Sequence, residues 1–202
     1  MGTYQIEINF ASGNHDKIAE VKNILEKHGI KVNTMDSKVR EIQANTLEEI
    51  AADSAKITAD LLAKSVVVED AGLFIPSLRG FPGPYSSYAH NTIGCRGILG
   101  LMAEKADRSA VFRSAVSYCE PNSEPFVFTG EVKGRISLTE RNGRKFGYDP
   151  VFIPGELDGR AFSELTIDEK NNISHRSRSF SKFAMWFLTR TKNTKLFADP
   201  SQ

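Results

Sequence analysis

The sequence has few cysteines, no long apolar run and no excess of charge of either sign. Cys95 and Cys119 are its only cysteines, without a C-x-x-C pair or a histidine at zinc-ligand spacing, which argues against a disulfide framework and a structural zinc site. No apolar run approaches membrane-spanning length. With 26 lysines and arginines against 25 acidic residues, no overall field would hold the chain on nucleic acid or an anionic membrane. Any anion must therefore be bound by a local cluster.

Other absences narrow the class further. The chain contains no G-x-x-x-x-G-K-[ST] motif, no internal repeat and no low-complexity tract. Residues 4–10 alternate polar and apolar side chains instead of forming the apolar core of a signal peptide, so we expect a cytoplasmic protein. A length of 202 residues, of which 40% are hydrophobic, predicts one well-packed globular domain.

The first thirty residues have the pattern of a strand, a polar loop and a helix. Apolar residues alternate along 6–10, and between residues 18 and 29 they follow the period of an amphipathic helix. The loop between them carries Ser12, Asn14 and Lys17. Because the positive end of a helix dipole attracts anions, this loop is a candidate phosphate site.

A second helix and strand are followed by two neighbouring carboxylates. The sequence from Thr46 to Glu49 is typical of a capping box that opens a helix, which should run to about Lys64. The apolar run 65–68 that follows predicts a buried strand, with Glu69 and Asp70 at its C-terminal end. In α/β sheets ligands bind at that end of the strands, so these two acids are candidates for chemistry.

The rest of the chain predicts a mixed sheet. Residues 79–85 are rich in turn formers and should line a cleft or a subunit contact. Alternating segments at 110–118 and 126–136 indicate a long antiparallel hairpin, 151–153 a final short strand, and 174–188 a C-terminal helix. The fold class is therefore α/β.

One stretch of the sequence gathers several kinds of chemistry. Phe146-Gly147-Tyr148-Asp149-Pro150 is followed by Lys170-Asn171-Asn172 and then by Ser174-His175-Arg176. A ring that can stack on a planar ligand, a carboxylate, an ammonium, an imidazole and a guanidinium suit a purine. Taken singly, these pieces are more often a core turn and a helix cap with solvated basic residues.

Together with the 12–17 loop and Glu69-Asp70, this combination resembles the inosine triphosphate pyrophosphatase family, enzymes that hydrolyse non-standard purine nucleoside triphosphates. The resemblance runs from about Ile6 to about Phe187. It implies one domain over residues 1–202, with an elongated mixed sheet flanked by helices. A second lobe would be built on the long hairpin, and a nucleotide cleft would lie between the lobes. It also implies a homodimer and the conversion of ITP, XTP or dITP to the monophosphate and pyrophosphate.

The resemblance implies a magnesium site as well. Similar enzymes hold the ion with a glutamate that matches Glu41 and an aspartate that matches Asp70, the residue also assigned to the activation of water; Glu69 is a further candidate ligand. Magnesium commonly joins one or two carboxylates to substrate phosphates. This chain departs from the family pattern at Arg40, Ala44 and Ala71, where relatives have proline, glycine and serine.

The remaining site residues divide between phosphate and base. Ser12, Asn14, Lys17 and Lys56 would bind the triphosphate, although a lysine at the position of Lys56 on a helix is ordinarily solvated. The base-binding candidates are Phe146, Tyr148, Asp149, Lys170, His175 and Arg176. Lys170, His175 and Arg176 would donate to the 6-carbonyl that hypoxanthine and xanthine carry and adenine lacks, a discrimination on the order of 10⁴ when several donors combine. Guanine shares this carbonyl, and the pattern gives no account of its rejection.

Two other functions fit parts of the pattern. Related pyrophosphatases for modified pyrimidines also open with a strand and a phosphate-loop helix, and turnover of pyrimidine triphosphates without turnover of ITP would favour them. The basic segment 175–178 also permits a nucleic-acid surface, against which the near-neutral net charge argues. Salt-dependent binding of oligonucleotides without release of pyrophosphate would favour that function.

Overall fold

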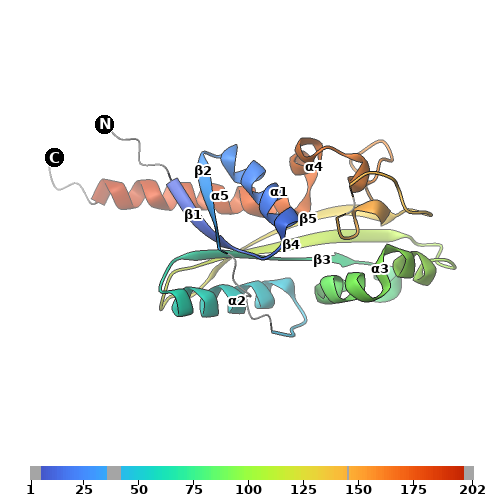
Figure 1. The fold of residues 1–202 in the computed structure, drawn as a ribbon, viewed down its shortest axis with the longest axis horizontal. Coiled ribbons are helices and arrows are strands. Elements are labelled where there is room, and N and C mark those ends of the chain that lie inside the picture. The colour runs from blue at the N-terminus through green and yellow to red at the C-terminus, as the bar shows by residue number, and fades with distance from the viewer. Residues whose placement is uncertain (1–5, 36–41, 145, 198–202) are drawn as a thin grey trace.

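The protein is described by a computed structural model that covers the backbone of residues 6–35, 42–144 and 146–197, and side chains as far as Lys192 (Figure 1). One mixed sheet runs through it in the order β2-β1-β3-β4-β5-β6. Its strands are β1 (Ile6–Ala11), β2 (Ile30–Met35), β3 (Val66–Phe74), β4 (Ser109–Cys119), β5 (Phe126–Ile136) and β6 (Phe152–Pro154). The helices are α1 (His15–Glu26), α2 (Leu47–Leu62), α3 (Ser86–Leu101), α4 (Ile167–Ile173) and α5 (His175–Phe197).

Strand β1 is the centre of the parallel part of the sheet. It pairs in parallel with β2 on one side and with β3 on the other, and helices α1 and α2 make the two crossovers. The crossover through α1 runs from β1 to β2, and the crossover through α2 runs back across the sheet from β2 to β3. Two right-handed crossovers that run in opposite directions put their helices on opposite faces of the sheet. Figure 1 shows this arrangement, with α1, α4 and α5 above the sheet and α2 and α3 below it.

Strand β3 is longer than the sequence predicted. The apolar run predicted a strand over 65–68 that ends before Glu69 and Asp70, whereas β3 continues to Phe74, so both acids lie inside the strand. The reason is its second neighbour. Beyond its one pairing with β1, at Phe10 and Val67, the strand stays paired with β4 along its whole length. After Val67, the edge of β3 on the side of β1 has no strand partner among the described residues. Residues 68–71 of this part of the strand line the cavity that is described below.

Most of the other expected elements are confirmed. The hairpin is present as β4 and β5, the final strand as β6, and the predicted helices as α1, α2 and α5. The sequence argument did not predict β2, α3 or α4. Helix α3 carries weak apolar periodicity and is broken at Gly94, where φ is 61° and ψ is −167°, values that only glycine adopts without strain.

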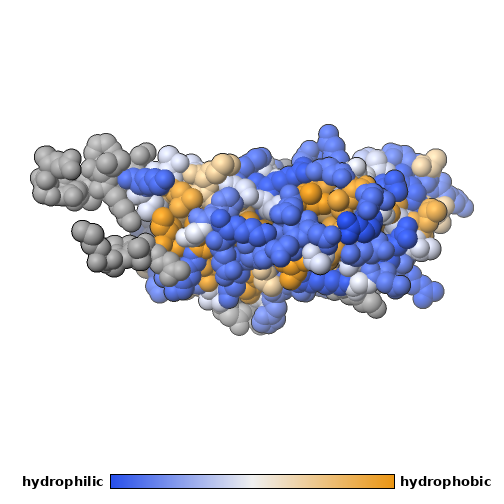
Figure 2. All heavy atoms as spheres, turned by 90° about the horizontal axis from the view of Figure 1, so that it is seen from above, coloured by the Kyte–Doolittle hydropathy of each residue, from blue (hydrophilic) through white to orange (hydrophobic). Residues whose placement is uncertain are grey.

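Apolar packing occurs on both sides of the sheet. One cluster joins α1 and α5 to β1 through residues such as Phe10, Val21 and Phe180, and another surrounds Phe112, Phe152 and Phe162. Figure 2 shows that the surface seen from above is largely hydrophilic, with apolar residues in separate patches. Within the described part of the chain, no helix is both long and apolar enough to cross a membrane.

Candidate functional site

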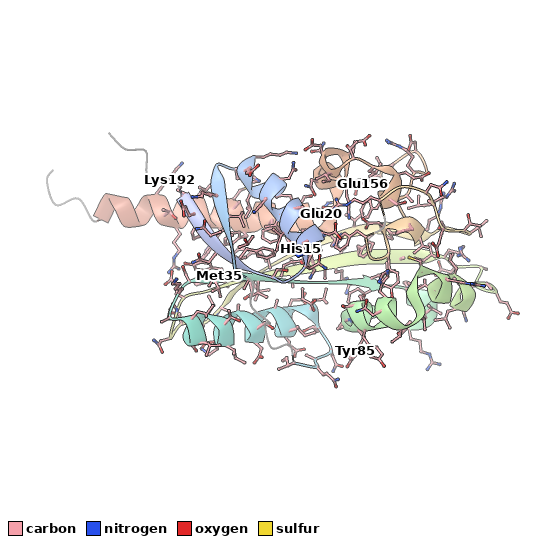
Figure 3. All side chains as sticks on the ribbon, viewed as in Figure 1. His15, Glu20, Met35, Tyr85, Glu156 and Lys192 are labelled. Carbon is pink, nitrogen blue, oxygen red and sulfur yellow. The ribbon has the colours of Figure 1, made fainter. Side chains whose placement is uncertain are left out.

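A cavity of about 590 Å³ lies where β1 ends and β3 continues past it. Its walls come from residues 11–17 after β1, from the middle of β3, from the start of α3, from residues 146–149 and from the α4–α5 junction. Figure 3 shows His15 at the start of α1 above the sheet and Tyr85, just before α3, below it. The cavity therefore lies beyond the end of β1 and beside β3, two neighbouring strands whose following helices, α1 and α3, lie on opposite faces of the sheet. Open α/β sheets bind ligands at such a position, and the size of the cavity suits a nucleotide.

The predicted phosphate loop forms one wall. Asn14 caps α1, because its Oδ1 accepts from the backbone N–H of Lys17 at 3.1 Å, and the Ser12 hydroxyl accepts from the Asn14 N–H at 3.2 Å. The Lys17 ammonium donates to the Glu69 carbonyl at 3.1 Å and lies 3.0 Å from the carboxylate of the same residue. The structure thus brings Ser12, Asn14 and Lys17 to the cavity, at the positive end of a helix.

The carboxylates of Glu69 and Asp70 have different surroundings. Glu69 is buried, accepts from the Ser114 hydroxyl at 2.8 Å, and lies against Lys17 and Arg176. Burial would raise the pKa of Glu69, but the charges of Arg176 and Lys17 outweigh it and lower the pKa to about 2. Both oxygens are engaged with these donors, so a metal ion there would have to displace them. The structure favours Glu69 as a partner of cations over Glu69 as a metal ligand.

Asp70 points to the opposite face of β3, since neighbouring side chains on a strand alternate. It is half-buried and lines the cavity, and its Oδ1 accepts from the backbone N–H of Ala71 at 2.9 Å. No group of three or more His, Cys, Asp or Glu side chains gathers as a metal cluster within residues 6–35, 42–144 and 146–192. Glu41, the other predicted metal ligand, lies outside the described residues.

At the other end of the cavity, the predicted base-binding residues meet a residue that the sequence argument missed. Glu20 of α1 is fully buried and accepts from Lys170 at 2.8 Å and from Arg176 at 2.6 Å. Lys170 also donates to Asp149 at 2.5 Å, and Arg176 Nε lies 3.2 Å from Glu69. Figure 3 shows Glu20 near the middle of the molecule, above the sheet. Its only sequence signal is an acid beside Val21, on the apolar face of a helix.

Burial and the neighbouring charges shift the pKa values of several groups in this network. Burial would raise the pKa of Glu20, but the charges of Arg176 and Lys170 lower it to about 2. Burial raises the pKa of Asp149 in spite of Lys170, and the charge of Glu20 adds to the rise. The pKa of His175 lies well below its usual range, first because of burial and then because of the charge of Arg176. We infer a neutral imidazole beside ionised Glu20, Lys170 and Arg176.

The aromatic residues of the site differ in position. Phe146 is half-buried and lines the cavity, with the Lys170 ammonium 5.0 Å and the Arg176 guanidinium 5.7 Å from its ring centre. Tyr148 also lines the cavity but is only 3% exposed, and it packs edge-on against His90 of α3. His175 stacks on Phe112 with ring centres 4.6 Å apart. Phe146 is therefore the ring placed to stack on a ligand, and Tyr148 is a wall.

Lys56 is not brought to this site. Its ammonium donates to the Ser123 carbonyl at 3.2 Å and to the Glu124 carboxylate at 3.0 Å, at the turn between β4 and β5, and it is absent from the cavity wall. The helix that carries Lys56 was predicted, but the direction in which the Lys56 side chain points from that helix was not. The start of α3 instead contributes Ser87, His90 and Asn91 to the wall, none of which the sequence argument identified.

The chain is similar to known proteins over most of its length. The Ham1 family model matches residues 8–186. A dITP/XTP pyrophosphatase of Methanopyrus kandleri is 48% identical over 90% of this chain and 96% of its own length, and one of Methanothermobacter marburgensis is 50% identical over the same shares. Among solved structures, the Ham1 protein of Staphylococcus aureus superposes with a TM-score of 0.78 at 30% identity, covering 91% of this chain and 99% of its own. The HAM1 protein of Coxiella burnetii gives 0.79 at 28% identity over the same shares.

Proposed function

The chain belongs to the Ham1 family, and from that premise we propose that it hydrolyses dITP, XTP and ITP to the monophosphate and pyrophosphate, with magnesium, Asp70 and Lys17 at the reacting phosphates. The relatives named dITP/XTP pyrophosphatase cover nine-tenths of the chain at 48% and 50% identity. The protein is accordingly a nucleoside triphosphate pyrophosphatase for non-canonical purine nucleotides.

The observation that carries the base assignment is the number of N–H groups left at the buried cations. A guanidinium has five N–H donors and an ammonium has three. Arg176 donates one N–H of Nη1 to Glu20 and one N–H of Nη2 to Glu69, so each terminal nitrogen keeps a second N–H. Its Nε lies 3.2 Å from Glu69 but makes no hydrogen bond with the described residues. Lys170 uses two N–H groups on Glu20 and Asp149 and keeps a third. These donors lie around the Phe146 ring, where a stacked purine would present its 6-carbonyl.

Adenine carries an amino group at the same position, and a donor that faces a donor stays unpaired. Leaving a buried donor unpaired costs about 1–3 kcal/mol, and more for a charged group. The carboxylates of Glu20, Glu69 and Asp149 hold the cations in place without filling their donor capacity. We assign base selection to Lys170 and Arg176, with His175 and Asp149 as further polar contacts and Tyr148 as the wall behind them.

The phosphate end follows from the other wall. Ser12, Asn14 and the first N–H groups of α1 would bind the triphosphate, and Lys17 would neutralise it. Lys17 already has a carboxylate partner in Glu69, so its ammonium is held at the cavity before the substrate arrives. Lys56 takes no part in this assignment because it pairs with Glu124.

Asp70 fits a magnesium ion in its usual protein setting, since one or two carboxylates suffice when phosphates and water complete the coordination. Asp70 lines the cavity on the uncovered edge of β3, and Glu41 is the second candidate. The ion, when bound, would supply charge stabilisation at the phosphates. Asp70 would orient the water that attacks the α-phosphorus and take its proton as the bond to the bridging oxygen breaks. Pyrophosphate then leaves, its charge balanced by Lys17.

The proposed domain comprises residues 1–202, with a second lobe on the β4–β5 hairpin, and the proposed assembly is a homodimer in the cytoplasm. The uninterrupted sheet of the described residues supports one domain. Light scattering of the purified protein tests the assembly, because a dimer has twice the mass of the 22.4 kDa chain.

A pyrophosphate-release screen tests the function. ITP, XTP and dITP should be hydrolysed at least about a hundredfold more efficiently than ATP, since unpaired buried donors oppose adenine. Chelation of magnesium should abolish release, and its return should restore it. Equal turnover of ATP and ITP, or turnover confined to pyrimidine triphosphates, would contradict the assignment of the base pocket.

A further inference from the structure

Arg144 lies beside the cavity without being part of its wall. It follows β5, in the segment that leads to Phe146, and its Nη2 donates to the carboxylate of Asp16 at 2.6 Å. Asp16 belongs to the first turn of α1, next to Lys17, and lines the cavity. The ion pair therefore joins the segment that carries the proposed stacking ring to the helix that carries the proposed phosphate site.

Arg144 makes three further contacts, two through its guanidinium and one through its backbone. Its guanidinium carbon is 6.0 Å from the centre of the Phe146 ring, and its Nη1 is buried, 3.8 Å from Glu20 and without a hydrogen-bond partner among the described residues. Its backbone N–H donates to the Ser163 carbonyl at 2.9 Å. The side chain thus fills the space between α1 and the ring.

The local backbone does not by itself hold the ring in position. Gly143 and Gly147 flank this short segment with φ values of 113° and 51°, and the flanking helices and strands supply no ladder hydrogen bonds at Phe146. Glycine permits many conformations. A tertiary contact is needed to select one of them. Arg144 reaches α1 through its hydrogen-bonded ion pair with Asp16 and through the longer approach of Nη1 to Glu20.

We propose that Arg144 is a positioning residue for the purine, which anchors residues 146–148 to α1 through Asp16 and holds the Phe146 ring against the bound base. The proposal rests on the stacking function proposed for Phe146. Arg144 touches no phosphate or base edge in this arrangement. Its loss should weaken the binding of all purine triphosphates by a similar factor and leave the chemical step unchanged.

A different effect of the pair has to be separated from this one. Arg144 neutralises Asp16 close to the phosphate loop, so Arg144→Ala would also expose a negative charge to the triphosphate. Asp16→Asn breaks the ion pair but removes that charge. If Arg144 acts by holding the segment, both variants raise KM; if it acts only by neutralising Asp16, Asp16→Asn leaves KM unchanged.

The experiment compares steady-state constants for ITP and ATP. Arg144→Ala and Asp16→Asn should each raise KM for ITP about two- to fivefold, the range of a partly exposed ion pair, with kcat within about twofold and the ITP-to-ATP ratio of kcat/KM unchanged. Arg144→Lys should recover part of the loss. Arg190→Ala is the matched control, since Arg190 also pairs with a carboxylate and lies over a ring, but its partner Glu120, unlike Asp16, does not line the cavity; it should leave both constants unchanged.

The Phe146→Ala background shows whether Arg144 acts through the ring. There, Arg144→Ala should have no further effect on KM. The same two- to fivefold rise in that background, or an unchanged KM in the Asp16→Asn protein, would overturn the proposal. If Phe146→Ala itself leaves KM unchanged, the stacking function fails and this proposal with it; if Phe146→Ala raises KM and Arg144→Ala does not, only the positioning function fails.

Discussion

Glu20 provides the charge that holds Lys170 and Arg176, the two cations proposed to contact the base. Its two carboxylate oxygens accept hydrogen bonds from Lys170 and Arg176. Each cation also pairs with a second carboxylate, Lys170 with Asp149 and Arg176 with Glu69. A fully buried guanidinium between two carboxylates is costly to truncate, because the acids are then left unpaired, at about 3–5 kcal/mol. A test of Arg176 in base recognition therefore has to keep its charge.

Arg176→Lys meets that requirement. A lysine preserves the charge opposite Glu20 and Glu69 but lacks the planar fork that leaves an N–H for the base. We expect kcat/KM for ITP to fall about 10- to 100-fold and that for ATP much less, so the ITP-to-ATP preference should shrink. Lys17→Ala is the comparison, since a phosphate contact carries no information about the base and should lower both values equally. An unchanged preference in Arg176→Lys would move recognition of the 6-position to Lys170 and His175.

Asp70→Asn tests the chemical step. The amide keeps the shape of the side chain and removes the charge needed for the metal and for the proton of the attacking water. Turnover of ITP should therefore fall at least about 10²-fold at saturating magnesium. Circular dichroism and the thermal midpoint should stay those of the parent protein, because Asp70 is only half-buried. Parent-like turnover at saturating magnesium would remove Asp70 from the mechanism.

At the scale of elements, the sequence predicted those whose signal is local. The periodicity of α1 and the alternation of β4 and β5 are properties of the segments themselves, and Thr46 caps α2 as expected. The end of β3 and the site contributed by α3 were not predictable in this way. The first depends on pairing with β4, and the second on a helix whose pattern is interrupted by glycine at positions 94, 97 and 100.

The buried network was only half predictable for the same reason. Lys170, His175 and Arg176 belong to a recognisable motif, whereas Glu20 lies 150 and more residues away from its partners. Lys56 shows a different difficulty, because its helix was predicted correctly but its ammonium contacts Glu124 at the β4–β5 turn and is absent from the cavity wall. Distance along the chain and the rotation of a helix are both settled by packing.

The contact between β5 and α5 yields a prediction at this scale. A methyl group on Gly130 would overlap the His175 carbonyl and the Ser179 backbone nitrogen, so the glycine lets the start of α5 lie close on the sheet. Gly130→Ala should lower the free energy of unfolding by about 1–3 kcal/mol and also lower activity on ITP, because His175 and Arg176 must move. Gly100→Ala places no atom within 4 Å of the new methyl group. It should leave the free energy of unfolding within about 1 kcal/mol of the parent and the activity on ITP within about twofold. Urea titration and ITP kinetics measure the two effects, and a Gly130→Ala protein of parent stability would contradict this packing.

At the scale of the whole molecule, the site is a balanced buried charge cluster inside a protein of net charge +1. Glu20, Glu69 and Asp149 face Lys17, Lys170 and Arg176 across one cavity. Attraction of an anionic nucleotide is therefore local to the cavity wall, and the rest of the surface contributes no strong field. Stability should depend on pH through Glu20, Glu69 and the neighbouring His175, because burial and nearby charges shift the pKa of each of these groups in the folded protein.

His175 gives the clearest pH dependence. Burial and the charge of Arg176 outweigh the nearby carboxylates and hold the pKa of His175 well below its usual range. Below about pH 6.5 the unfolded chain takes up a proton at this histidine and the folded protein does not, so the free energy of unfolding must fall as pH falls, by at most about 1.4 kcal/mol per pH unit. Glu20 is an acid whose pKa is lowered to about 2 in the folded protein. Its contribution to stability is complete above about pH 4.5 and is lost only as pH falls below that value. The raised pKa of Asp149 acts with the opposite sign as pH falls, so the contribution of the histidine is isolated by comparing the parent with a His175 variant between pH 7.0 and 5.5.

Urea titrations at pH 7.0 and 5.5 should show a loss of stability in the parent protein that His175→Gln largely removes. His15→Gln, at an exposed histidine on the first turn of α1, is the control and should keep the parent loss. The sign is the informative part of the result. A histidine held in the charged form by Glu20 and Glu69 would make the protein more stable at pH 5.5 than at pH 7.0, and that outcome would require His175 to enter the base pocket as a cation.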